Sequence, residues 1–226
     1  MNNGAVAGIG LNKFYSKIYA FLAMGIGVSA LVSYLILNVY PVVLKTLLSS
    51  VPLFFGLWIV QIGLVFFLGV KAQKNPSLAI GGFVAYSILN GVTISATLLM
   101  YAQATVVSAF VSAAATFGAM SLVGMFTKKD LSAMGHAAYS ALIGIIIAMV
   151  INFFFLRSSA VSFFISILMV LIFAGITAYD NQKIRTVYNQ SGGQAGTGIA
   201  VFFALQLYLD FINLFLAFLR IFGKNN

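Results

Sequence analysis

From Asn75 to Thr127 the chain reads NPSLAIGGFVAYSILNGVTISATLLMYAQATVVSAFVSAAATFGAMSLVGMFT, without one charged residue. A helix needs about 20 apolar residues to cross a bilayer, so this stretch is long enough for two spans. Its best interruption is Tyr101-Ala-Gln-Ala-Thr105, which predicts spans at 78–100 and 105–126. The residues do not alternate as in a membrane-embedded β-strand. The stretch therefore predicts two helices in lipid.

The rest of the chain has the same character. Of its 226 residues, 62% are hydrophobic and 7% are charged, whereas soluble domains carry about 25% charged residues. The composition excludes a soluble or disordered protein and predicts an all-α integral membrane protein, with residues 1–226 forming a single seven-helix domain. Long apolar runs with few or no charged residues predict the five remaining spans at 19–40, 51–70, 134–156, 160–180 and 199–221. We expect residues 181–198 to form a flexible loop.

Few residues in the chain can carry catalytic or metal chemistry. It has no cysteine, one histidine (His136) and three acids, Asp130, Asp180 and Asp210. Thiolate and multi-histidine metal sites are excluded, and a two-metal carboxylate site needs more acids. We therefore expect no enzyme, no cofactor and no permanently bound metal. The net charge of +9 is spread between the apolar runs, which argues against a nucleic-acid partner.

Basic residues in the short loops predict the orientation. With seven spans, one side carries eight of them and the other side four. The eight are Lys13, Lys17, Lys71, Lys74, Lys128, Lys129, Lys183 and Arg185; the four are Lys45, Arg157, Arg220 and Lys224. We expect a bacterial inner-membrane protein with a cytoplasmic amino terminus and an external carboxyl terminus.

Asp210 lies near the middle of the last predicted span. An ionised carboxylate there costs about 2.5–3.5 kcal/mol on insertion scales, so it is not expected to face lipid. Gln206, Asp210 and Asn213 follow one another at helical spacing and form a polar stripe. This stripe is predicted to face the interior of the helix bundle.

Asp180 ends the sixth predicted span, so two acids lie on consecutive membrane helices. Two carboxylates that share a low-dielectric site cannot both ionise cheaply, and the pair is expected to hold a proton. When that proton leaves, a cation must compensate. Lys71 or Lys74, at the end of the second span, is a possible latch on Asp180, and a permeating ion is the alternative.

Four segments resemble the Bax inhibitor (transmembrane Bax-inhibitor-motif) family. They are Asn90-Gly-Val-Thr-Ile-Ser95, Lys128-Lys-Asp-Leu-Ser132, Tyr179-Asp-Asn-Gln-Lys-Ile-Arg185 and Leu207-Tyr-Leu-Asp-Phe-Ile-Asn-Leu-Phe215. The resemblance implies six helices around a central, polar seventh. It also implies a pH-sensitive calcium leak governed by an aspartate pair, which falls here on Asp180 and Asp210, with transient calcium contact at both. Gln61 stands where some members carry an acid in the second span.

Three other functions remain open. A non-transporting regulator would bind a membrane protease or another membrane protein, and an exchanger would couple one ion to another. An intramembrane aspartyl protease would also place acids on two neighbouring helices. Those proteases carry Gly-x-Gly-Asp at the second acid, whereas this chain has Leu207-Tyr-Leu-Asp210. The expected partners are the lipid bilayer, calcium ions and protons, and for a regulator other membrane proteins.

Overall fold

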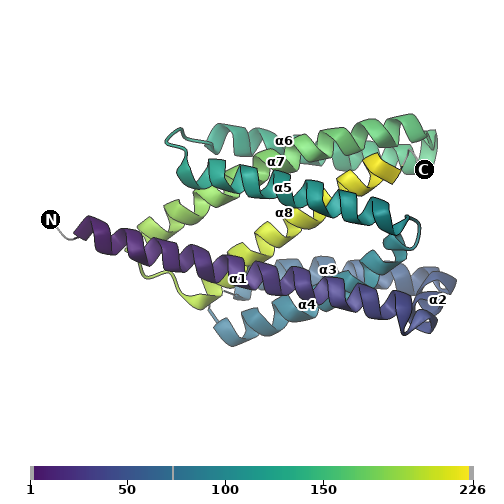
Figure 1. Cartoon of the computed structure of the whole chain (residues 1–226), viewed down its shortest axis with the longest axis horizontal. Helices are drawn as coiled ribbons and strands as arrows, with labels where there is room; N and C mark the ends of the chain where they lie inside the picture. Colours follow the sequence, from purple (N-terminus) through teal and green to yellow (C-terminus); the bar gives the residue numbers. More distant parts are fainter. Residues whose placement is uncertain (1–2, 73, 224–226) are drawn as a thin grey trace. The chain divides into compact units, whose positions relative to one another are not determined.

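A computed structural model describes residues 3–72 and 74–223; Lys224, counted in the charge bias, lies outside them. The described residues form helices and no strand (Figure 1). The elements are α1 (Asn3–Asn38), α2 (Pro41–Ser49), α3 (Val51–Lys71), α4 (Pro76–Leu98), α5 (Gln103–Phe126), α6 (Ser132–Ile151), the π-helical turn η1 (Asn152–Leu156), α7 (Ser159–Gln190) and α8 (Thr197–Gly223).

Seven helices in the described ranges are long and apolar enough to cross a membrane. They start at Gly10 in α1 and include α3, α4, α5, α6 with η1, α7 and α8. The all-α fold with seven spans is therefore confirmed. The predicted interruption in the long apolar run is also correct, because α4 ends at Leu98 and α5 begins at Gln103.

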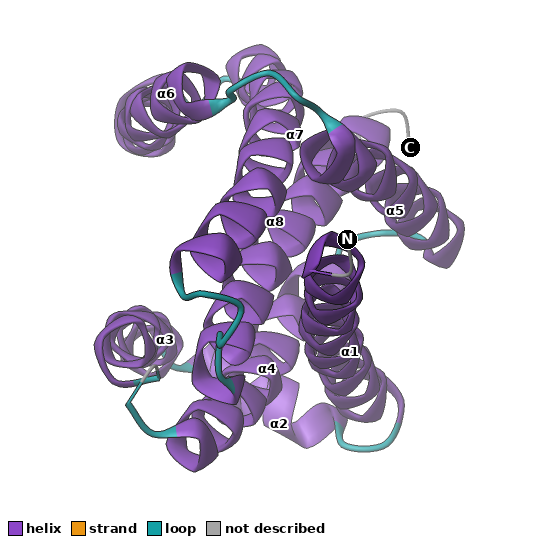
Figure 2. Cartoon of the chain, turned by 90° about the vertical axis from the view of Figure 1, so that its left-hand side faces the viewer, coloured by secondary structure: helices purple, strands orange, loops and turns teal. Residues whose placement is uncertain are grey.

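The chain divides into two compact units, the first made of Met1–Met100 and Tyr188–Tyr208. In this unit α1 packs along α4, and α3 packs on α4 (Figure 2). The hydroxyls of Ser29 and Ser33 donate to the backbone carbonyls of Ser87 and Gly91, at 2.7 and 2.8 Å. A methyl group on Gly91 would overlap the backbone of Ser29, so glycine allows this close approach.

The second unit comprises Tyr101–Val187 and Leu209–Asn226. Here α5 approaches α7 at Gly124, where an added Cβ would overlap the carbonyl of Ala178. The rings of Phe110 and Phe117 on α5 pack edge-on against Phe211 of α8, with centroids 5.5 and 5.8 Å apart. Small residues and aromatic rings therefore fix the helix that carries Asp180 and the part of α8 that carries Asp210.

The prediction of a flexible loop over 181–198 was wrong for its first half. Helix α7 continues to Gln190, and only residues 191–196 connect it to α8. Gly192 and Gly193 have φ values of 63° and 80°, the left-handed region that favours glycine, so the turn is placed there. The polar residues after Asp180 remain helical because several of them have tertiary hydrogen-bond partners.

Two further boundaries differ from the prediction. Helix α1 begins well before residue 19, and the nine-residue helix α2 was not predicted. Pro41 occupies the first turn of α2, where a missing N–H is tolerated. At the end of α6, Asn152 accepts from the N–H of Ser158 and donates to its carbonyl, so the side chain closes the π-helical turn.

Candidate functional site

Helix α8 is the most buried of the spans in the described structure. Its most apolar window is 67% buried, against 11–44% in the other spans. Asp210 is 4% exposed and does not face lipid, as the cost of charge burial predicted. Gln206 and Asn213, the other members of the stripe, are half-buried. The central position of α8 among the six other spans remains a prediction.

One carboxylate oxygen of Asp210 has no hydrogen-bond partner. Within the described residues, two buried polar atoms have no hydrogen-bond partner: Oδ2 of Asp210 and Oε1 of Gln206. Asn213 instead donates to the carbonyl of Leu209, at 2.8 Å. A buried carboxylate without a donor is costly when ionised. Oδ2 of Asp210 therefore needs a partner from outside the described residues: a proton, a water molecule or a cation.

Asp180 is 1% exposed and has a donor. The hydroxyl of Tyr139 on α6 donates toward both carboxylate oxygens of Asp180, at 3.1 Å from Oδ1 and 3.3 Å from Oδ2. The Tyr139 ring remains 37% exposed, so this side chain reaches inward from the surface of α6. Asp180 lies inside α7 and not at the helix end where the sequence placed it.

Asp180 and Asp210 belong to the same unit and act on each other electrostatically. The negative charge of Asp180 acts on Asp210, and both acids act on Tyr139. No hydrogen bond joins the two carboxyl groups in the described part of the chain. Two buried like charges that interact oppose each other's ionisation. The two acids that the sequence selected therefore interact electrostatically, and Tyr139 donates to one of them.

The residues after Asp180 hold α7 to its neighbours. Gln182 donates to the carbonyl of Lys129 and accepts from the N–H of Leu131, both at 2.8 Å. Arg185 donates to the carbonyls of Met125 and Thr127, both at 3.0 Å, and so binds the carboxyl end of α5. These side chains give the motif after Tyr179 a positioning role.

Lys183 is the cation nearest in sequence to the pair. Its charge acts on Asp180, and its Nζ lies 5.9 Å from the centroid of the Tyr179 ring. Asp130, the third acid of the chain, is exposed. The side-chain and backbone hydrogen bonds of Ser132 lower the pKa of Asp130 below its ordinary value. Asp130 is therefore ionised at neutral pH and does not belong to the buried pair.

Lys71 and Lys74 lie at and just after the end of α3 and are exposed. They belong to the first unit, so their role as a latch remains a prediction. Gln61 in the middle of α3 is buried, and its amide donates to the carbonyl of Leu57 at 3.3 Å and to Thr93 at 3.5 Å. The side chain at this position in the second span is thus neutral and hydrogen-bonded.

Sequence reasoning missed Tyr139. It precedes Asp180 by 41 residues on another helix, and no local motif connects the two. A tyrosine in an apolar span indicates an interface or packing residue as readily as a donor. No three His, Cys, Asp or Glu side chains in the described residues come together to hold a metal ion. Any cation contact here would rest on the acid pair.

Comparison with known proteins identifies the family. The sequence profile described as "Inhibitor of apoptosis-promoting Bax1" matches residues 11–226. The chain belongs to this Bax inhibitor family, and the resemblance drawn from the four motifs is confirmed. These motifs lie in α4, in the α5–α6 loop, in α7 and in α8.

Relatives in the Bax inhibitor family are bacterial membrane proteins. A membrane protein of Streptococcus pyogenes serotype M1 is 48% identical over 219 residues, which cover 96% of this chain and 95% of the relative. The inner membrane protein YbhL of Escherichia coli K12 is 38% identical over 219 residues, which cover 95% of this chain and 93% of the relative. These names and the family description specify no enzymatic activity. The chain is thus a multi-pass membrane protein of this family.

Proposed function

We propose that this protein forms a pH-sensitive calcium leak in the bacterial inner membrane, with Asp180 and Asp210 as its titrating pair. The observation that carries the proposal is the buried acid pair with one unpartnered oxygen on Asp210. A structural acid would be expected to have donors for its buried oxygens. An oxygen without a donor leaves room for a proton or a passing cation.

Protonation changes the charge of the pair. With one proton the pair carries a single negative charge, which Tyr139 and Lys183 can balance. When the proton leaves, Asp210 becomes an ionised group without a donor among the described residues. Calcium, which prefers carboxylate oxygens, or a basic side chain such as Lys71 or Lys74 can then compensate. Compensation by calcium corresponds to a conducting state, and compensation by a basic side chain corresponds to a latched state.

Tyr208 provides an argument against the aspartyl protease alternative. This residue stands at the x position of Gly-x-Gly-Asp, between Leu207 and Leu209, which replace the two glycines. It is fully buried, shares a hydrogen bond with Ser29, and packs edge-on against the rings of Phe83 and Tyr86. A large packed ring blocks the backbone approach that a peptide substrate needs.

The test is calcium flux into proteoliposomes at pH 6, 7 and 8. Asp180→Asn and Asp210→Asn should each flatten the pH profile of calcium flux, because the remaining acid is no longer affected by the charge of the other. The double variant should add little to the larger single effect, since the acids titrate as one unit. Asp130→Asn is the matched control, because this acid is exposed and outside the pair.

Two results would count against the leak. Native flux and an unchanged pH profile in both single variants would make the acid pair structural. Absence of flux from the native protein, in vesicles where a known channel conducts, would favour the regulator that binds another membrane protein. Calcium entry that depends on a gradient of a second ion would favour the exchanger.

A further inference from the structure

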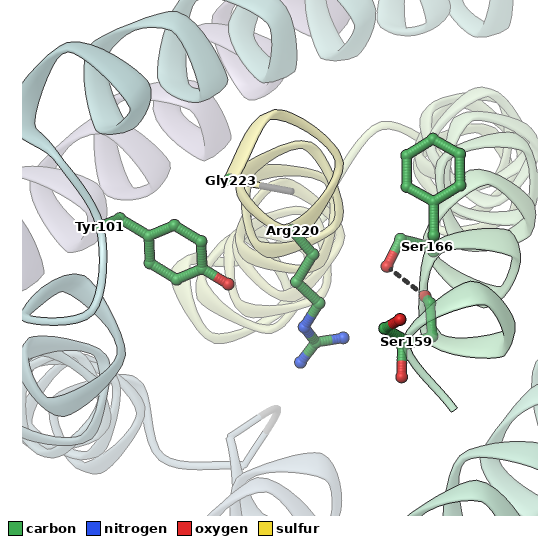
Figure 3. A pocket seen from close by; sticks show the side chains of 7 residues that line it. Tyr101, Ser159, Ser166, Arg220 and Gly223 are labelled. Carbon is green, nitrogen blue, oxygen red and sulfur yellow. Dashed lines mark hydrogen bonds between the residues drawn. The ribbon is translucent and has the colours of Figure 1, made fainter. Parts of the chain in front are cut away.

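A second candidate site lies away from the acid pair, in the second unit. A cavity of about 400 Å³ lies beside the last turn of α8 and the first two turns of α7 (Figure 3). Its walls carry one cation and several hydroxyl groups. They are formed by Tyr101, Ser159, Ser162, Phe163, Ser166, Arg220 and Gly223.

Arg220 extends its guanidinium toward this cavity, between Tyr101 and the serine-bearing helix (Figure 3). The side chain is half-buried. In the part of the chain that the structure describes, it makes no hydrogen bond and no ion pair. The chain has only three acids: Asp130 is exposed beside Ser132, and Asp180 and Asp210 form the buried pair. None of the three acidic side chains therefore serves as the counter-charge of Arg220.

The serines add donors on the same side. Ser159, Ser162 and Ser166 follow at i, i+3 and i+7, which places them on one face of α7. The hydroxyl of Ser166 donates to the backbone carbonyl of Ser162. Ser162 accepts from Asn152 at 2.7 Å, so its own hydroxyl proton can be given to a ligand. Tyr101 packs on Gly223 so closely that an added Cβ there would overlap the tyrosine ring.

We propose that this cavity binds a phosphate-bearing anion through Arg220, with Ser159 and Ser162 as supporting donors. Guanidinium matches phosphate by paired hydrogen bonds, and hydroxyls are ordinary donors to its remaining oxygens. The cavity lies where α7 begins and α8 ends, at the edge of two predicted spans. A lipid headgroup is the phosphate found at that depth, and free inorganic phosphate shares its chemistry.

The test uses the full-length protein in detergent, with binding followed by native mass spectrometry and by thermal unfolding. The probes are phosphatidylglycerol, a diacylglycerol with the same acyl chains but no phosphate, and inorganic phosphate. Arg220→Gln should weaken phosphatidylglycerol binding about tenfold. Arg157→Gln, which removes an exposed cation from the loop before α7, is the matched control and should bind as the native protein does.

Arg220→Lys is the second variant. It keeps the positive charge but loses the paired geometry, so it should bind more weakly than the native protein even if the glutamine variant does not fold. Binding of phosphatidylglycerol alone identifies a lipid headgroup, and equal stabilisation by inorganic phosphate identifies a site for the free anion. Equal binding of the diacylglycerol, or native affinity in both Arg220 variants, would overturn the proposal.

Discussion

The two buried acids are not equivalent. Tyr139 donates to Asp180, whereas Oδ2 of Asp210 has no partner in the described part of the chain. A donor stabilises the ionised form of the acid that it contacts. A proton held by the pair is therefore expected on Asp210, and Asp210→Asn should reproduce the protonated state of the native protein.

Tyr139→Phe removes the donor and keeps the ring. We expect the midpoint of the flux–pH profile to move to higher pH by up to about one unit, because the proton can then reside on Asp180 as well as on Asp210. A hydrogen bond to a charged group contributes about 1.5–3 kcal/mol, and one pH unit corresponds to about 1.4 kcal/mol. Proteoliposome flux between pH 5 and 8 measures the shift. Tyr179→Phe is the control, since Tyr179 packs beside Tyr139 but makes no hydrogen bond to either acid in the described structure. An unmoved midpoint would show that Tyr139 does not belong to the pair.

At the scale of the helices, Gly124 and Gly118 provide a direct comparison on α5. A Cβ on Gly124 would overlap the carbonyl of Ala178 and the Cβ of Asn181, whereas a Cβ on Gly118 meets nothing within 4 Å. The close α5–α7 contact thus requires glycine at one position and tolerates alanine at the other.

Gly124→Ala should lower the free energy of unfolding by about 1–3 kcal/mol, the usual cost of overpacking. Gly118→Ala should leave it unchanged or raise it by up to about 1 kcal/mol, because alanine favours a helix over glycine. Thermal unfolding in detergent, followed by circular dichroism, separates the two. Equal melting temperatures for the two variants would mean that α5 and α7 are not held at Gly124.

The element scale also shows what sequence can and cannot predict. Apolar length alone located all seven spans, because nothing but a helix satisfies its backbone in lipid over such a run. The extension of α7 through 181–190 was missed, since its polar residues are held in a helix by Gln182 and Arg185 contacts that no local pattern reveals. The acid pair could be predicted because acidic residues are rare in a membrane span. The role of the Tyr139 hydroxyl could not, because tyrosines are common there as packing residues.

At the scale of the whole molecule, orientation is the open prediction. Because the chain has no cysteine, single cysteines can report on the side of each loop. Arg157→Cys should react with an impermeant thiol reagent on intact cells, and Lys128→Cys should react only after permeabilisation, since the basic residues favour a cytoplasmic α5–α6 loop. Both positions are exposed in the structure, so burial does not limit labelling. The reverse labelling pattern would invert the topology.

The length of α7 has a consequence for how this protein responds to its membrane. Its 32 residues form a rod of about 48 Å at about 1.5 Å per residue, whereas the hydrocarbon layer is about 30 Å thick. A thinner bilayer would require more tilt of such a rod, and Arg185 would transmit the tilt to α5. Because Asp180 lies on the same helix, a change in bilayer thickness is expected to move Asp180 and so to act on the acid pair. Calcium flux should therefore differ between vesicles of short and long acyl chains at constant pH.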